Sequence, residues 1–161
     1  MKLEKLISGT ECRILKGDIE TEISDVCSDS RKIKPGALFV CLDGLKSSGA
    51  DYISEAIAKG ANAVLISSTA KEKAKALTSE SDTAVLEAEN VRSSLAFLCS
   101  SLHNQPQDGI RIIAVTGTNG KTSVTQILKH IFTKEKIKAE TIGTLDGSMT
   151  TPDPEELYKE L

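Results

Sequence analysis

The segment TGTNGKTS, residues 116–123, combines the residue types that bind a phosphate group. Gly117 and Gly120 allow backbone angles that other residues avoid and let a ligand approach the main chain closely. Successive main-chain N–H groups can then form a nest for anionic oxygens. Lys121 adds a mobile cation, and the hydroxyl of Thr122 is suited to a magnesium ion that bridges phosphate oxygens. Lys121 is therefore the candidate catalytic residue and Thr122 the candidate metal ligand.

The spacing in this segment matches a short phosphate-loop pattern, GxxGK[ST]. The longer pattern, GxxxxGK[ST], would place a glycine where this chain has Val115. A glycine-rich turn without a nucleotide is the alternative. The context favours nucleotide binding, because residues 110–115 are typical of a strand and 121 to about 134 of a helix, whose positive end would face the phosphates. The predicted ATP-binding residues are Gly117, Thr118, Asn119, Gly120, Lys121, Thr122 and Ser123.

Alternating strand and helix patterns surround this loop. The predicted strands are 12–15, 22–27, 37–42, 61–67, 83–89, 110–115 and 138–144. The predicted helices are a short one at the N-terminus, 51–59 capped by Asp51, 69–78, 90–102 started by Asn90, 121–134, and a last one with Asp153 as cap and Pro154 as first residue. This order predicts an α/β fold with parallel strands.

A polar segment, HNQPQDG at 103–109, contains Pro and Gly and has no apolar periodicity. Such composition is typical of a linker between domains. We therefore predict one domain at 1–104, a linker at 105–109 and the start of a second domain at 110–161.

The overall composition limits the possible partners. The net charge is −3, so there is no global basic field to attract a nucleic acid. No apolar run approaches the ~20 residues of a membrane-spanning helix, and the N-terminus is too polar for a secretory signal. The four cysteines form no CxxC pair and, with two histidines, no convincing zinc site. We expect reduced thiols in a cytoplasmic protein without nucleic-acid or membrane partners.

Three segments together resemble the Mur ligase family, the ATP-dependent enzymes that build the stem peptide of peptidoglycan. TGTNGKTS is similar to their ATP loop, which folylpolyglutamate synthase shares. DSRKIKPGALFVCLDG at 29–44 resembles the substrate-domain motif of the MurE and MurF types. GTLDGSMTTPDPEELYKEL at 143–161 resembles the MurE type, and its TTPDP element discriminates best. The resemblance spans essentially the whole chain in the right order.

The resemblance implies a small N-terminal substrate domain followed by the start of a P-loop mononucleotide-binding domain with a parallel α/β fold. By position, the residues implied to contact the UDP-sugar are Ser28, Ser30, Leu45, Lys46 and Ser47. Thr150 and Thr151 match contacts to the sugar-peptide portion. Each segment also has a plain structural interpretation, because SDSR is a common polar turn and Thr151 can help to start a helix.

The implied reaction is the addition of an amino acid, lysine or diaminopimelate, to UDP-N-acetylmuramoyl-L-alanyl-D-glutamate. ATP and Mg²⁺ are the implied cofactors. The substrate carboxylate becomes an acyl phosphate, which the incoming amino group attacks. Lys121 is implied to stabilise the transferring phosphoryl group, so the protein's task is chiefly positioning and charge neutralisation.

Family members are far longer than this chain. They carry a magnesium-binding Glu, a His, a carbamylated Lys and a third domain beyond the position of Leu161. We therefore expect an N-terminal portion that is inactive as a ligase by itself. Three alternatives stay open: a UDP-substrate-binding module with a vestigial phosphate loop, a MurF-like ligase, and an unrelated P-loop kinase or NTPase. The last is disfavoured because no apolar run ends in an Asp suited to magnesium.

Overall fold

The computed structural model describes residues 1–44, 47–143 and 152–161. The chain divides into two compact units, Met1–Gln105 and Pro106–Leu161. The division falls at the segment that the sequence assigns to a linker. Each unit is described by itself below.

The first unit contains a five-stranded sheet. Its strands lie in the order β1-β5-β4-β3-β2. Their bounds are β1 Arg13–Lys16, β2 Val26–Cys27, β3 Leu38–Val40, β4 Ala63–Ile66 and β5 Ala84–Glu87. β2, β3, β4 and β5 run parallel, and β1 pairs with β5 in the antiparallel sense. All five strands were predicted from the sequence, four of them within three residues of their observed ends.

The predicted strand 22–27 is shorter than expected. Only Val26 and Cys27 pair with β3. Glu22 forms a bridge with Lys2 instead, and the N–H of Ile23 donates to the carbonyl of Met1 over 2.8 Å. The N–H of Ser24 still donates to the carbonyl of Gly36 just before β3 over 2.9 Å.

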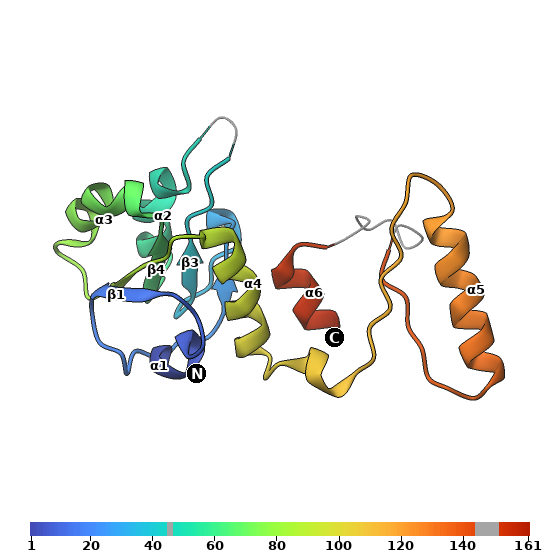
Figure 1. Cartoon of the computed structure of the whole chain (residues 1–161). Helices are drawn as coiled ribbons and strands as arrows, with labels where there is room; N and C mark the ends of the chain where they lie inside the picture. The colour runs from blue at the N-terminus through green and yellow to red at the C-terminus, as the bar shows by residue number, and fades with distance from the viewer. Residues whose placement is uncertain (45–46, 144–151) are drawn as a thin grey trace. The chain divides into compact units, whose positions relative to one another are not determined.

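Helices cover both faces of this sheet (Figure 1). They are α1 Leu3–Ile7, α2 Ile53–Ala58, α3 Lys71–Thr78 and α4 Val91–Leu102. α2 contacts α3, whereas α1 contacts α4 on the other face. Parallel strands covered on both faces are apolar along their whole length, and every residue of β3 and β4 is buried. The continuous apolar runs of the sequence therefore predicted these strands correctly.

Successive side chains of each strand point to opposite faces of the sheet, so the core is divided between these two faces. Phe39 packs with Ile53 and Ala56 of α2, while its neighbour Leu38 is fully buried on the opposite side. Leu95 and Leu98 of α4 are also buried. A core of aliphatic side chains agrees with the 3% aromatic content of the chain.

The start of the second predicted helix is different from the prediction. Ser48, and not Asp51, caps a short 3₁₀ helix, Gly49–Tyr52, which leads into α2. Asp51 accepts from the N–H of Ser48, which completes a reciprocal capping box. Gly49 packs on the backbone just after β3: an added Cβ would lie 2.5 Å from the carbonyl carbon of Cys41.

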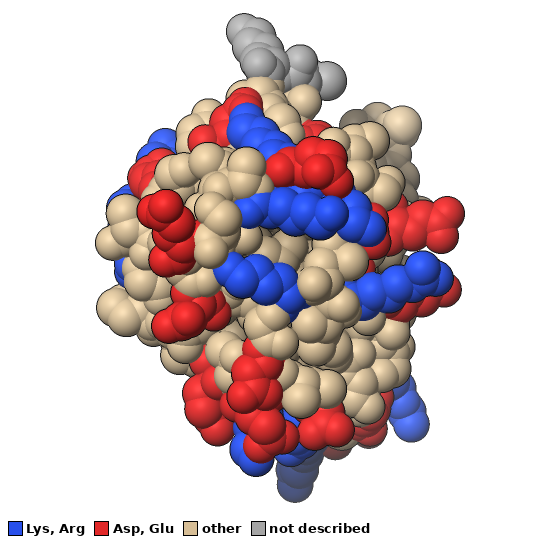
Figure 2. All heavy atoms as spheres, turned by 90° about the vertical axis from the view of Figure 1, so that its left-hand side faces the viewer, with Lys and Arg blue, Asp and Glu red and all other residues tan. Residues whose placement is uncertain are grey.

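Opposite charges are interleaved on the face of the molecule that carries α3 (Figure 2). The ion pairs of α2 and α3 are Lys59–Glu55, Lys71–Glu87, Lys73–Asp51 and Lys75–Glu72. Exposed pairs of this kind contribute little to stability. Their mixture of signs leaves no extended basic surface on this face.

The second unit contains α5, Lys121–Lys134, α6, Pro154–Glu160, and a 3₁₀ helix, Pro106–Gly109. Pro154 is the first residue of α6, as predicted, but the side chain of Asp153 makes no cap hydrogen bond. The predicted strand 110–115 is wrong, and residues 138–143 of the predicted strand 138–144 are also not a strand. Residue 144 lies outside the described residues.

Both wrong predictions have the same cause. A strand needs a neighbour to complete its ladder of hydrogen bonds, and neither segment pairs with another strand in the described residues. The apolar side chains that indicated buried strands are exposed instead. The exposed large apolar residues of this unit are Ile110, Ile112, Ile113, Val124, Ile127, Ile131, Ile137 and Ile142.

Across residues 1–44, 47–143 and 152–161, none of the helices has the length and apolar character needed to cross a bilayer.

Candidate functional site

The parallel strands of the first unit end at one edge of the sheet, and a polar residue follows each of them. Ser28 follows β2, Asp43 lies beyond β3, Ser67 follows β4, and Asn90 lies beyond β5. Ligands of open α/β sheets bind outside the carboxyl ends of parallel strands. This edge carries a hollow of about 510 Å³ lined by nine residues: Glu11, Cys41, Leu42, Asp43, Ser67, Glu89, Asn90, Val91 and Arg92.

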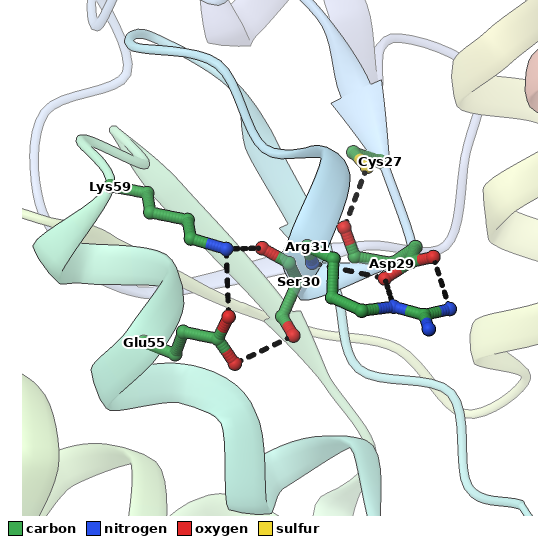
Figure 3. Close-up of polar contacts among 6 residues, drawn as sticks. All are labelled: Cys27, Asp29, Ser30, Arg31, Glu55 and Lys59. Atoms are coloured by element: carbon green, nitrogen blue, oxygen red, sulfur yellow. Dashed lines mark hydrogen bonds and ion pairs between the residues drawn. The ribbon is translucent and has the colours of Figure 1, made fainter.

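The turn that follows β2 is fixed by an internal ion pair. Asp29 caps the short 3₁₀ helix Ser30–Lys32 by accepting from the N–H of Arg31 over 3.0 Å. The guanidinium of Arg31 also donates from Nε and Nη2 to the two carboxylate oxygens, at 2.9 and 2.8 Å (Figure 3). These hydrogen bonds lower the pKa of Asp29 to about 2. Both carboxylate oxygens of Asp29 therefore accept hydrogen bonds from within the turn.

Ser30 points the other way, toward α2. Its side chain is buried, and its Oγ donates to Oε2 of Glu55 over 2.8 Å. Lys59 donates to Oε1 of Glu55 over 2.7 Å and to the carbonyl of Ser30 over 2.8 Å. The hydrogen bonds from Lys59 and then Ser30 lower the pKa of Glu55. The predicted substrate residue Ser30 thus belongs to a closed triad with Glu55 and Lys59 (Figure 3).

The loop after β3 is closed at its base. Oγ of Ser48 donates to Oδ1 of Asp43 over 2.6 Å, and the N–H of Gly44 donates to the carbonyl of Ser47 over 3.0 Å. Ser47 is exposed. Because β2 and β3 are adjacent and parallel, the predicted residues Ser28, Ser30 and Ser47 follow neighbouring strands at the same edge of the sheet. Leu45, Lys46, Thr150 and Thr151 lie outside the described residues.

The predicted phosphate loop, residues 116–123, leads into α5 in the second unit. Gly117 has φ of +148° and Gly120 has φ of +80°, so both glycines use angles that other residues rarely adopt. Gly120 is the residue immediately before α5, and no side chain caps the helix. The Nζ of Lys121 donates to the carbonyl of Gly117 over 2.6 Å. Lys121 and the loop therefore lie together at the N-terminus of a 14-residue helix, the positive end of its dipole.

The residues of this loop fit a phosphate ligand. Residues 117–120 are exposed, and an added Cβ at Gly120 would meet nothing within 4 Å, so the main chain is open to solvent. The first amides of an α-helix have no intrahelical acceptor. Ser123 lies in the first turn with Lys121 and Thr122. The described residues contain no group of three or more His, Cys, Asp or Glu that could hold a metal ion.

Sequence reasoning missed three residues whose hydrogen bonds hold the segments after β2 and β3: Asp43, Glu55 and Lys59. Glu55 and Lys59 are four residues apart on a predicted helix, a spacing that indicates an ion pair. Their contact with Ser30 joins segments 25 residues apart, and no local pattern predicts it. The hollow was also missed, although polar residues after successive strands are a signal for it.

The comparison with protein families identifies both units. The model described as "Mur ligase family, catalytic domain" matches residues 22–101, and the "Mur ligase middle domain" matches residues 115–161. The chain belongs to the Mur ligase family.

Among the similar curated proteins are several with the printed name UDP-N-acetylmuramoyl-L-alanyl-D-glutamate--2,6-diaminopimelate ligase. The protein of that name from Syntrophomonas wolfei is 39% identical over 145 residues, which are 90% of this chain and 28% of the relative. That of Clostridioides difficile is 37% identical, over 95% of this chain and 32% of the relative. The chain thus spans about a third of the length of the curated relatives it matches.

A solved structure shows the same fold. A UDP-N-acetylmuramoylalanyl-D-glutamyl-2,6-diaminopimelate--D-alanyl-D-alanyl ligase from Acinetobacter baumannii aligns with a TM-score of 0.60 at 22% identity. The alignment covers 83% of this chain and 28% of that one. At this identity the likeness concerns the fold, so the predicted Mur-type α/β architecture is confirmed.

Proposed function

We propose that this chain provides the UDP-substrate domain and the phosphate loop of an ATP-dependent ligase of peptidoglycan synthesis. The ligase adds 2,6-diaminopimelate to UDP-N-acetylmuramoyl-L-alanyl-D-glutamate. The printed names of the relatives support diaminopimelate over lysine. Because the chain spans about a third of those relatives, the complete reaction belongs to the longer protein. The use of ATP supports a cytoplasmic location.

One observation carries this proposal: a left-handed glycine, Gly120, stands directly before α5, and Lys121 is the first residue of that helix. This geometry directs main-chain N–H groups, a helix N-terminus and a cation to one point. A triphosphate is the ligand that uses all three. The proposed ATP contacts extend through Thr118, Asn119 and Ser123.

The residues of this chain bind and position the reactants. ATP supplies the phosphoryl group that converts the D-glutamyl carboxylate into an acyl phosphate. The amino group of diaminopimelate then attacks this acyl phosphate, and inorganic phosphate leaves. Lys121 neutralises negative charge on the phosphates, a role that positioned cations play in phosphoryl transfer. Thr122 provides the hydroxyl that would hold Mg²⁺, whose chemistry is to neutralise phosphate oxygens.

The substrate contacts proposed for the first unit lie after β2 and β3. Ser28, Ser30 and Ser47 bind the UDP part together with Leu45 and Lys46. Thr150 and Thr151 bind the sugar-peptide part. The position of the first three at the carboxyl edge of the sheet supports this assignment.

Calorimetry on the 161-residue chain tests the proposal. We expect binding of UDP-N-acetylmuramoyl-L-alanyl-D-glutamate, weaker binding of ATP with Mg²⁺, and no ligase turnover. Lys121→Ala should weaken ATP binding by about tenfold or more, because a charge-assisted contact is lost, and should leave the UDP-substrate affinity unchanged. Lys134→Ala, in the last turn of the same helix, is the matched control. Equal ATP affinity in the wild type and Lys121→Ala would contradict the role of the loop.

The exposed apolar side chains of the second unit favour a second candidate, a UDP-substrate-binding module with a vestigial phosphate loop. Ile112 and Ile127 are about 60% exposed, whereas the first unit has a closed core. The same titrations separate the two candidates, because the module binds the UDP-substrate and not ATP.

A further inference from the structure

We propose that Glu55 and Lys59 are positioning residues that fix the hydroxyl of Ser30 as a hydrogen-bond acceptor. In this state Ser30 binds a donor group of the nucleoside part of the substrate, either the imide N–H of uracil or a ribose hydroxyl. It does not bind a phosphate oxygen. This inference rests on the proposed function, that the first unit binds a UDP-sugar.

The argument begins with the single proton of the hydroxyl. A serine side chain has one O–H donor and two acceptor lone pairs. Oγ of Ser30 stands 2.8 Å from Oε2 of Glu55, and an ionised carboxylate only accepts. The proton of Ser30 is therefore used by Glu55, and only acceptor capacity is left for a ligand.

Lys59 keeps Glu55 in the form that this argument needs. Its ammonium donates to Oε1 of the carboxylate over 2.7 Å, so the carboxylate stays ionised and its other oxygen faces Ser30. The same ammonium donates to the carbonyl of Ser30 over 2.8 Å. Lys59 thus ties α2 to both the main chain and, through Glu55, the side chain of one residue (Figure 3).

The charges around Ser30 also disfavour a phosphate. The carboxylates of Glu55 and Asp29 flank it, and each already has its cation, Lys59 or Arg31. A phosphate oxygen at Ser30 would meet an acceptor without a proton to offer it. A donor N–H or O–H would instead complete the hydrogen bonding of a buried hydroxyl.

The experiment is calorimetry on the full 161-residue chain with three probes: UDP, N3-methyl-UDP and 2′-deoxy-UDP. We expect one of the two analogues to bind the wild type about tenfold more weakly than UDP, because one hydrogen bond is lost. Loss with N3-methyl-UDP identifies the imide as the donor, and loss with 2′-deoxy-UDP identifies the 2′-hydroxyl. Equal affinity for all three probes would overturn the proposal.

Variants then test the positioning role. Glu55→Ala frees the proton of Ser30, so UDP should bind several-fold more weakly. The analogue that binds the wild type more weakly than UDP should then differ from UDP by less than about threefold in affinity. Glu55→Gln keeps a carbonyl oxygen as acceptor and should restore much of the discrimination. Because both changes act through one hydroxyl, Ser30→Ala combined with Glu55→Ala should lose no more affinity than Ser30→Ala alone.

Glu72→Ala is the matched control, since Glu72 forms a similar exposed pair with Lys75 on α3. It should leave both the UDP affinity and the analogue penalty unchanged. If Glu55→Ala binds the probes as the wild type does, Glu55 has no positioning role. If the wild type binds no UDP, the proposed substrate domain fails and the role of Ser30 fails with it; these two failures are therefore distinguishable.

Discussion

The two units of this chain bury their apolar residues to very different extents. In Met1–Gln105 the residues of β3 and β4 and the inner faces of α2 and α4 are buried. In Pro106–Leu161 α5 has no buried residue, although its sequence contains Val124, Ile127 and Ile131 at helical spacing. An amphipathic pattern alone therefore does not provide a core.

This difference teaches where stability resides. Most helical stability in proteins comes from packing of an apolar face rather than from intrinsic propensity. The first unit has five strands to pack against, and its Gly49 allows close packing of the backbone. The second unit presents a loop whose glycines serve backbone conformation. We expect the first unit to dominate unfolding and the second to dominate phosphate binding.

The largest expected effect contrasts two isoleucines on helices. Ile53→Ala in α2 removes a fully buried side chain and should destabilise the first unit by about 2–5 kcal/mol. Ile127→Ala in α5 removes one that is 59% exposed and should change stability by less than about 0.5 kcal/mol. The measurement is urea denaturation of both variants beside the wild type.

Thiol labelling reports the first unit selectively, because all four cysteines lie in it. Burial raises the pKa of Cys41 to about 12, so this thiol should react only after unfolding. Ile53→Ala should speed its labelling, and Ile127→Ala should not. Equal effects of the two variants on the labelling rate of Cys41 would contradict the proposed difference between the units.

A smaller effect contrasts two glycines. Gly49→Ala places a Cβ 2.5 Å from the backbone of Cys41, just after β3, and should cost the first unit about 1–3 kcal/mol. Gly120→Ala meets no atom but must adopt φ of +80°, which costs about 1–2 kcal/mol locally. Urea denaturation should detect the first change, and ATP titration the second. A global loss of stability in Gly120→Ala would show that the loop is coupled to the core.

The smallest effect concerns the polar turn after β2. Arg31→Ala should return the pKa of Asp29 from about 2 toward its ordinary 3.8. Because the folded-state pKa is the lower one, the stabilisation is present above pH 3.8 and is lost as the pH falls toward 2. Carboxyl-carbon NMR titration measures this shift.

Lys32→Ala is the control for that titration, since Lys32 is the weakest of the causes that lower this pKa. It should move the pKa of Asp29 much less than Arg31→Ala does. An unchanged pKa in Arg31→Ala would mean that the paired guanidinium does not hold the turn.

Sequence patterns predicted the first unit well because its elements are locally consistent. The apolar runs at 37–42 and 61–67 became β3 and β4, and Asn90 caps α4 by accepting from Ser93. The same kind of run at 110–115 did not become a strand. An apolar run favours burial, but a strand also requires hydrogen bonds to a neighbouring strand.

In the candidate site, too, local sequence predicted the backbone conformation but not the contacts between distant residues. The glycine and lysine spacing at 116–123 predicted the positive φ angles at Gly117 and Gly120. The segment SDSR predicted a turn but not its partners. Glu55 and Lys59 come from a helix that begins more than twenty residues later, and their bonds with Ser30 depend on how α2 packs on the sheet.

The sequence by itself determined the family, the positive φ angles of Gly117 and Gly120 and the buried strands, because each depends on residue types at short spacing. The tertiary structure alone decided which polar groups meet: Ser30 with Glu55 and with Lys59. The physical reason is that backbone preferences act between near neighbours in the chain, whereas hydrogen bonds between side chains require two elements to be placed within about 3 Å of each other.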